Sequence, residues 1–194
     1  ALFSGRAYNI ICELLGSNWY AVAATVALGA LAVCHIVYAF ILTAQNRSAR
    51  GANRYEVTAK PEKVEWASQN MLVLGVIVLL GLALHLFNFW YNMMFAELVG
   101  MRTVLEPTDG FGLIRATFQT KVYVILYVIW IVALWYHLSH GFWSAMQTIG
   151  INGKVWFNRW KVIGTVYVTL LMLAFLVVVL AFAFGCAPSL HCAA

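Results

Sequence analysis

Residues 122–146 read VYVILYVIWIVALWYHLSHGFWSAM, a stretch of 25 residues without Asp, Glu, Lys or Arg. A helix needs about 20 predominantly apolar residues to cross a hydrocarbon core about 30 Å thick. A strand of a membrane barrel would need only about 9–11 residues and would alternate between apolar and polar side chains. Because this stretch is long and does not alternate, it predicts a transmembrane helix.

The same pattern occurs four times along the chain. The charge-free runs have 33, 31, 32 and 33 residues, 129 of the 194 in total, and cover residues 14–46, 66–96, 122–153 and 162–194. Hydrophobic residues make up 63% of the chain and charged residues 10%, whereas soluble proteins average about 45–50% and about 25%. We therefore predict an all-α integral membrane helix bundle that forms one domain over residues 1–194. The predicted spans are about residues 19–43, 66–91, 122–146 and 162–184.

The segments that connect the spans differ in charge. Residues 45–65 and 147–161 follow the first and third spans and hold eight Lys or Arg residues, whereas the opposite side holds four. The positive-inside rule therefore places these two loops in the cytoplasm. The net charge of +5 lies beside lipid headgroups and does not indicate nucleic acid as a partner. The remaining connection, residues 92–121, is long and has a turn region at Pro107, Gly110 and Gly112.

Five histidines lie within the charge-free runs: His35, His85, His137, His140 and His191. An ionisable side chain at membrane depth is rare and favours a functional role. His35 lies ten residues before Gln45, at the cytoplasmic end of the first span, and His137 lies ten residues before Gln147, at that of the third. Both spans run in the same direction and ten residues rise about 15 Å, so the two imidazoles lie at matching depth. A haem in a bundle core needs two such axial histidines on different helices.

Small residues flank these two histidines. Gly141 follows His137 by about one helical turn, and Ala32 and Ala39 lie near His35 on its helical face. This arrangement leaves room for a flat macrocycle. Small residues also serve ordinary helix packing in membranes, so they support a haem site only weakly.

His85 lies about nineteen residues into the second span, counted from the cytoplasm. Gly81 precedes it by about one turn and is a candidate for leaving space for a haem beside it. The depth of His85 is nearer the outer face, where no other histidine of the chain lies on a predicted span. His85 is therefore either structural or one half of a second haem site. His140 is structural, or it reaches a haem propionate or a partner subunit, and His191 is expected at the surface.

Five segments of the chain carry a family resemblance: AYNIICELLGSNWYA, HIVYAFILTAQNRSARGANRY, WASQNM, HLFNFWY and YHLSHGFWSAMQTIGIN. They resemble the cytochrome b membrane anchor subunit of succinate dehydrogenase/fumarate reductase, of the five-helix, dihaem kind that works with menaquinone. The resemblance covers residues 2 to about 184. Its most specific part is the pattern H-x3-G-x8-G, which His137, Gly141 and Gly150 fill.

The resemblance implies two haem b groups. His35 and His137 match the ligands of the haem nearer the cytoplasm, and His85 matches the third-helix ligand of the distal haem. The partner of His85 in the family lies on a first helix that would precede Ala1. We expect that helix to be missing from the sequence given, rather than the protein to hold a single haem.

Further residues are candidates for contacts to the haem propionates and to the quinone. Arg115 and Lys121 are the candidates for propionates at the outer side, and those at the inner side are Trp66, Ser68, Gln147 and Lys161. The resemblance implies that menaquinone reacts near the distal haem. Quinone chemistry needs a group that exchanges protons, and Glu13 is preferred to Glu97 for that role.

The resemblance also implies partners and a location. A flavoprotein subunit and an iron–sulfur subunit would dock on the cytoplasmic loops, because this chain has neither a Gly-rich phosphate-binding motif nor a cysteine cluster for iron–sulfur ligation. The chain would then take part in the enzyme as the membrane subunit that binds no dicarboxylate. The expected location is the bacterial cytoplasmic (inner) membrane, among lipid, with a dimer of the whole complex as one arrangement.

Two alternatives stay open. The chain could be the cytochrome b subunit of a hydrogenase or formate dehydrogenase, although the segment HLSHGFWSAMQTIG argues against it. It could also be a haem-free anchor or a transporter, but a transporter would usually show broken helices or paired acids at mid-membrane. The direction of the reaction, succinate oxidation or fumarate reduction, does not follow from the sequence.

Overall fold

The structure, a computed structural model, describes residues 1–16, 18–50, 65–151 and 153–187. Within those residues all regular structure is helical, and four helices are long and apolar enough to cross a membrane. These helices are Trp19–Ala49, Met71–Val99, Lys121–Thr148 and Trp156–Ala183. The predicted all-α membrane bundle with four spans is therefore confirmed, and the chain is a multi-pass membrane protein. Most of the predicted loop at 45–65, and His191, lie outside the described residues.

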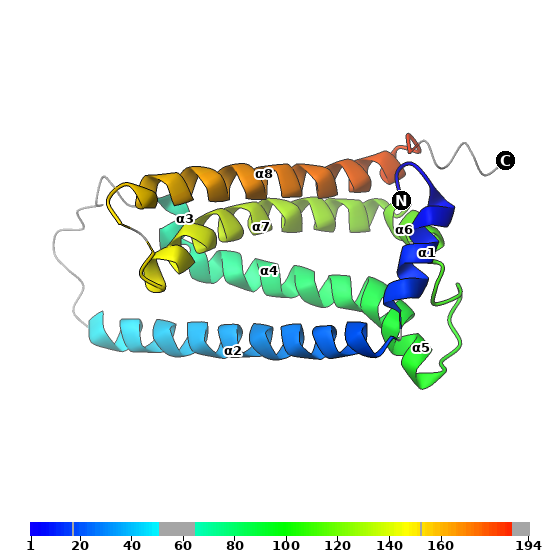
Figure 1. Ribbon diagram of the computed structural model, residues 1–194, viewed down its shortest axis with the longest axis horizontal. Coiled ribbons are helices and arrows are strands. Elements are labelled where there is room, and N and C mark those ends of the chain that lie inside the picture. Colours follow the sequence, from blue (N-terminus) through cyan, green and yellow to red (C-terminus); the bar gives the residue numbers. More distant parts are fainter. Residues whose placement is uncertain (17, 51–64, 152, 188–194) are drawn as a thin grey trace.

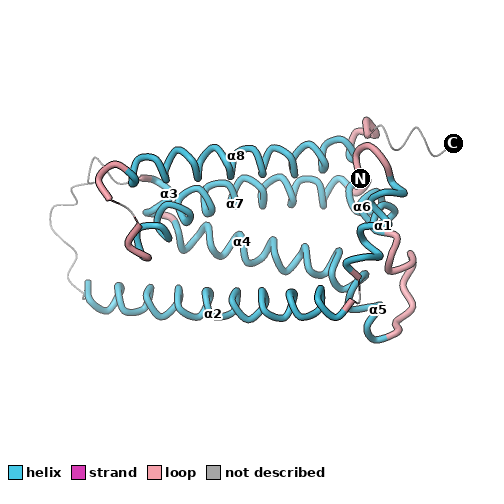
Figure 2. The backbone as a smooth tube through the Cα atoms, viewed as in Figure 1, coloured by secondary structure: helices cyan, strands magenta, loops and turns pink. Residues whose placement is uncertain are grey.

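The spans lie lengthwise beside one another, in the order α8, α7, α4 and α2 from top to bottom of Figure 1. The helix α7 (Lys121–Thr148) packs against both α8 (Trp156–Ala183) and α4 (Met71–His85), whereas α2 (Trp19–Arg50) stands apart from the other spans. Figure 2 shows the same helices lying lengthwise, and the sequence colours of Figure 1 show that successive spans run in opposite directions, so α2 and α7 run the same way. The predicted matching depth of His35 and His137 rests on this alternation.

The main core lies between α7, α8 and a short helix, α6 (Gly110–Phe118). Its members on α7 and α8 are each no more than 6% exposed: Tyr127, Ile131, Val168, Met172, Val179 and Phe182. Membrane helices associate through close van der Waals packing, because lipid tails are as apolar as the side chains themselves. At Gly164 of α8 the ring of Phe142 comes so near that an added Cβ would lie 2.4 Å from its Cδ1 atom. Glycine at this position therefore lets α7 and α8 meet.

The second span is longer and less regular than the sequence predicts. It starts with the short helix α3 (Trp66–Gln69), and α4 passes at its end into a π-helix, η1 (Leu86–Phe95), and then into α5 (Ala96–Val99). The helix ends at Gly100, which has a φ of 65°, a conformation that glycine adopts at helix ends. The aromatic residues 87–91, where the sequence predicts the end of the span, instead form part of η1. Turns of π-helix occur frequently at functional sites, and this one begins directly after His85.

Two short helices cross one end of the bundle, which the sequence predicts to be the outer end (Figure 1). They are α1 (Gly5–Leu15) and α6, which begins at Gly110, where the sequence predicts a turn region. The amide of Asn9 donates to Asp109 Oδ1 over 2.7 Å and accepts from the backbone N–H of Phe111 over 2.8 Å. The same carboxylate accepts from the N–H of Gly112 and caps α6. These bonds fix α1 to the start of α6.

Candidate functional site

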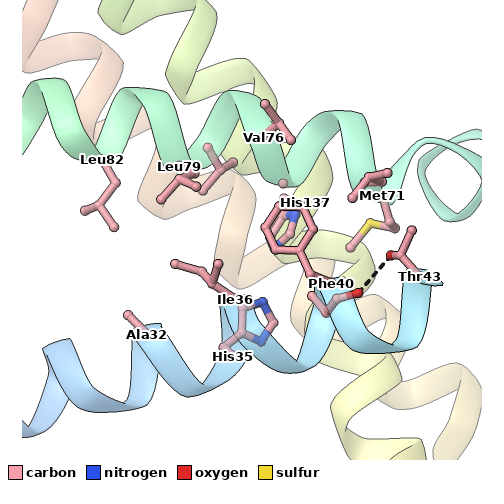
Figure 3. Close-up of a pocket in the computed structure, with 14 residues that line it drawn as sticks. Ala32, His35, Ile36, Phe40, Thr43, Met71, Val76, Leu79, Leu82 and His137 are labelled. Carbon is pink, nitrogen blue, oxygen red and sulfur yellow. Dashed lines mark hydrogen bonds between the residues drawn. The ribbon is translucent and has the colours of Figure 1, made fainter. Parts of the chain in front are cut away.

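His35 of α2 and His137 of α7 face one another across a gap between the helices (Figure 3). Their ring centroids are 6.2 Å apart and their planes make an angle of 85°. Two imidazoles that bind one metal ion from opposite sides have centroids about 6 Å apart, because a metal–nitrogen bond is about 2.0 Å and the ring centre lies about 1 Å further. The spacing of these two rings therefore fits one iron atom between them.

A cavity of about 270 Å³ adjoins the two rings, between α2 and α4. Its walls are mostly apolar, and they include the ring of Phe40 and the predicted Ala32 and Ala39. Thr43 also lines the cavity, but its hydroxyl already donates to the backbone oxygen of Ala39 over 2.8 Å. The two imidazoles are thus the main polar groups left in an apolar pocket, which is the usual character of a cofactor site.

A haem is larger than this cavity, so its binding would have to extend the cavity into a slot between α2 and α4. The most apolar 18-residue window of α2 has none of its residues buried. Since α2 stands apart from the other spans, the slot can widen without disturbing the core between α7 and α8. The apolar walls and the two facing imidazoles fit a haem held by this chain.

The Nδ1 atom of His137 is buried and has no hydrogen-bond partner among the described residues. A buried polar atom without a partner costs about 1–3 kcal/mol. A histidine that binds a metal through one ring nitrogen usually donates from the other. The imidazole of His137 therefore has an unsatisfied ring nitrogen at the place where a haem ligand is predicted.

Two glycines lie near His137. An added Cβ at Gly75 of α4 would lie 3.6 Å from His137 Cε1, whereas an added Cβ at Gly141 would meet nothing within 4 Å. The open space at Gly141 is the room predicted for a macrocycle, and its use by one stays a prediction. Gly75 was missed in the sequence, because only the packing of α4 shows that it faces the ring of His137.

His85 has different surroundings. Its ring lies against Phe89, Tyr127 and Trp130, with centroids 5.1, 6.2 and 5.5 Å away. Its Nδ1 atom is buried without a hydrogen-bond partner among the described residues. The predicted space beside Gly81 holds the indole of Trp130 in this structure, since an added Cβ would lie 1.9 Å from Trp130 Cδ1. The two interpretations of His85, structural residue or haem ligand, both remain open.

A charged cluster lies at the inner end of the spans. Lys161 Nζ is 2.7 Å from Glu65 Oε1 and 4.4 Å from the centre of the Trp143 ring, and His140 Nδ1 is 3.4 Å from Glu65 Oε2. The hydrogen bond from Lys161, aided by His140, holds the pKa of the Glu65 carboxyl below its ordinary value, against the effect of burial. His140 and Lys161 thus already hold one carboxylate, the chemical group that a propionate would present.

The other propionate and quinone candidates have exposed side chains. Trp66 is exposed beside the ring of Tyr136, at 5.1 Å. The remaining exposed candidates are Glu13, Ser68, Arg115, Lys121 and Gln147. The structure does not gather them around either histidine site, and their roles stay predictions. The carboxylate of Glu97 lies beside Gly16, where an added Cβ would be 2.5 Å from Glu97 Oε2.

Within the part of the chain that the structure describes, no three His, Cys, Asp or Glu side chains converge as ligands of a metal ion. The chemistry available at the candidate site is therefore that of a histidine pair. Comparisons of the chain with the profiles of protein families, with curated proteins and with solved structures found no match.

Proposed function

We propose that this chain is a dihaem cytochrome b membrane anchor of a succinate:quinone oxidoreductase or quinol:fumarate reductase. Its role is to carry electrons between an iron–sulfur subunit and menaquinone. The observation that carries the proposal is the pairing of His35 and His137, from two spans, with ring centroids 6.2 Å apart. The segment YHLSHGFWSAMQTIGIN, which resembles that family, supports it.

A haem bound at this pair would supply one-electron redox chemistry, and the chain supplies its surroundings. His35 and His137 would be its axial ligands. The apolar walls that α2 and α4 supply would set a low dielectric constant around it, which is one of the means by which a protein tunes a haem potential. Gly75 lies beside the imidazole of His137, where an added Cβ would already be in van der Waals contact with His137 Cε1 and a longer side chain would take up part of the cavity.

His85 is the proposed ligand of the second haem, toward the outer end. The structure describes no second histidine in contact with the ring of His85, so the other axial ligand must come from outside the described residues. Menaquinone would react at this end, with Glu13 as the candidate group for proton exchange. Electrons would pass between the two ends through the haem held by His35 and His137.

The dicarboxylate chemistry belongs to other polypeptides in this proposal. A flavoprotein subunit and an iron–sulfur subunit would dock at the inner end, in the cytoplasm of a bacterium whose inner membrane holds the chain. Exposed cations are present there, among them Arg47, Lys154 and Arg159. Arg159 lies over the ring of Trp156, with 5.2 Å between its Cζ atom and the ring centroid, so part of this surface is already ordered.

The test is a visible spectrum of the purified protein, reduced with dithionite and compared with the air-oxidised sample. We expect the bands of haem b, and the variant His137→Ala should lose the haem nearer the cytoplasm while keeping the other. His140→Ala, one turn further along α7, is the matched control and should keep both. A wild-type protein without haem b bands would overturn the proposal and favour a haem-free anchor or transporter.

A further inference from the structure

The indole of Trp130, on α7, lies in a notch of α4 that exists only because residue 81 is glycine. An added Cβ at Gly81 would lie 1.9 Å from Cδ1, 2.2 Å from Cγ and 2.4 Å from Nε1 of Trp130. These atoms belong to the ring itself and not to the end of a flexible chain, so they cannot yield without moving the whole side chain. Glycine permits such a close approach of backbone and ring.

A hydrogen bond fixes the same ring at a second point. Trp130 Nε1 donates to the backbone oxygen of Val78 over 3.0 Å. Val78 lies on α4 just before Gly81, so the notch and the bond hold the indole against one short stretch of helix. The indole of Trp90, by contrast, is buried with no partner for its Nε1 among the described residues. Trp130 is therefore fixed by a hydrogen bond as well as by its packing at Gly81.

The indole fixed in this way lies against the imidazole of His85. The two rings are 5.5 Å apart at an angle of 32°, and Phe89 lies 5.1 Å from the imidazole at 39°. Tyr127 meets the same ring more edge-on, at 68°, and its hydroxyl accepts a hydrogen bond from Asn88 over 3.4 Å. Three aromatic side chains from η1 and α7 therefore confine the imidazole.

Aromatic packing here replaces the hydrogen bond that usually orients a metal-binding histidine. Such a histidine commonly donates its second ring nitrogen to a carboxylate, a carbonyl or a water molecule. In His85 the Nδ1 atom is buried and has no partner among the described residues. The neighbouring rings are therefore the contacts that keep the imidazole from turning about its side-chain bonds.

We propose that Trp130, seated at Gly81, is a positioning residue that sets the plane of the His85 imidazole. The inference rests on the proposed function, in which His85 is a haem ligand. Gly81 then serves His85 indirectly, by admitting the indole, and not by making room for a macrocycle. The plane of an axial imidazole affects the electronic structure of a low-spin haem, so a change of plane has a spectroscopic signature.

The experiment uses the full chain, purified with its haem, and measures electron paramagnetic resonance and reduction potentials. Gly81→Ala places a methyl group where the indole lies, so Trp130 must leave. We expect shifted g values and a shifted potential for the His85-dependent haem only, with the haem content unchanged. Trp130→Phe, which keeps a ring but loses the bond to Val78, is the milder variant and should shift the same signals less.

A double variant separates positioning from simple disruption. If Gly81→Ala acts only by displacing the indole, it should add nothing in a chain that already carries Trp130→Ala, because no indole remains to displace. Non-additivity of this kind identifies two residues that act through one another. An effect of Gly81→Ala that is as large in the Trp130→Ala background would show that Gly81 acts by another route, and would overturn the inference.

Two matched controls exist within the same chain. Trp135→Phe removes an indole bond of the same kind on the same helix, from Trp135 Nε1 to Thr169 Oγ1 at 2.8 Å. Gly29→Ala adds a methyl group to a membrane helix where it meets nothing within 4 Å. Neither should alter the signals of the His85-dependent haem.

Different outcomes would contradict the positioning role of Trp130 and the proposed dihaem function. Unchanged g values and potential in both Gly81→Ala and Trp130→Phe would make Trp130 a packing residue only, while the dihaem proposal would stand. If His85→Ala leaves the spectrum unchanged, His85 binds no haem and the inference is wrong with that part of the proposal. If the wild-type chain binds no haem b, the proposed function itself fails.

Discussion

The two histidine regions of this membrane bundle differ in what surrounds the imidazoles. The inner region brings His35 and His137 together beside a cavity of about 270 Å³ with mostly apolar walls. The outer region packs His85 among Phe89, Tyr127 and Trp130. The inner region therefore has two candidate haem ligands with a cavity beside them. The outer region has one candidate haem ligand, His85, whose ring is packed against aromatic side chains.

Two kinds of surroundings therefore occur for histidines at membrane depth in this bundle. At the inner region the helices stand apart, and the paired rings border an apolar space that one shared ligand would fill. At the outer region the helices meet closely, and aromatic rings fix the orientation of one imidazole. A ligand that completes the inner site needs only to enter the slot, whereas one that completes the outer site must also bring a second axial group.

The largest expected effect is loss of the inner haem when either of its ligands is removed. His35→Ala and His137→Ala should each lower the haem content from two to one per chain, because a single imidazole cannot hold a low-spin haem. The double variant should lose no more than either single variant, since both remove the same site. Haem content per chain, measured after extraction, checks this. A double variant with less haem than either single variant would mean that the two histidines belong to different sites.

The second prediction fills the inner cavity without touching its ligands. Gly75→Leu places a branched side chain on α4 where an added Cβ alone lies 3.6 Å from His137 Cε1. We expect the inner haem to be lost or its content to fall at least several-fold, while the His85-dependent haem remains. Gly29→Leu, on the open face of α2, is the control and should keep both haems. Full haem content in Gly75→Leu would show that the macrocycle does not lie on this side of His137.

The fold and the inner pair can be predicted from the sequence for the same physical reason. A hydrocarbon core admits only long apolar helices here, and a helix rises by a fixed amount per residue. A count of ten residues from one end of each span, the end predicted to be cytoplasmic, therefore suffices to place His35 and His137 at one depth. Their approach to 6.2 Å confirms that depth.

Depth along a helix can be counted, but rotation about its axis depends on packing. Gly81 is predicted to face a macrocycle, and in the structure the indole of Trp130 fills that side. Gly75 was overlooked for the same reason. The π-helix after His85 could not be predicted, because a change of hydrogen-bond register has no signature in composition. The helix α6 was also missed, because it begins among residues that favour turns, and Asp109 caps it there.

A third prediction compares the charges at the two ends of the bundle. Charge reversal at the exposed Arg47, Lys154 and Arg159 of the inner end should weaken co-purification of the flavoprotein and iron–sulfur subunits several-fold without removing haem. Charged groups across an interface mainly affect the rate of association and the choice of partner, and salt screens exposed charges, so the loss should shrink as the salt concentration rises. Reversal of Arg115 and Lys121 at the outer end is the control. Equal losses from both sets would mean that the effect is general and not a docking contact.

The smallest expected effect concerns the charged cluster beyond the inner pair, which contrasts with the neutral aromatic rings around His85. The bond from Lys161 to Glu65, with help from His140, lowers the pKa of the Glu65 carboxyl from its ordinary value of 4.5. A carboxyl with a lowered pKa in the folded state stabilises that state above the ordinary pKa, and this stabilisation is lost as the pH falls through the lowered value. The Glu65 side chain is 44% exposed, so solvent limits the gain to less than about 1 kcal/mol.

Thermal unfolding in detergent measures this contribution. Between about pH 7 and about pH 3, a range that includes the titration of an ordinary carboxyl, the wild-type chain should lose slightly more stability than Glu65→Gln, whose amide does not titrate. High salt at pH 7 should reduce the difference between the two chains, because exposed ion pairs are screened. If Glu65→Gln and the wild type instead lose the same stability on acidification, the inner cluster contributes no more to folding than the uncharged outer region does.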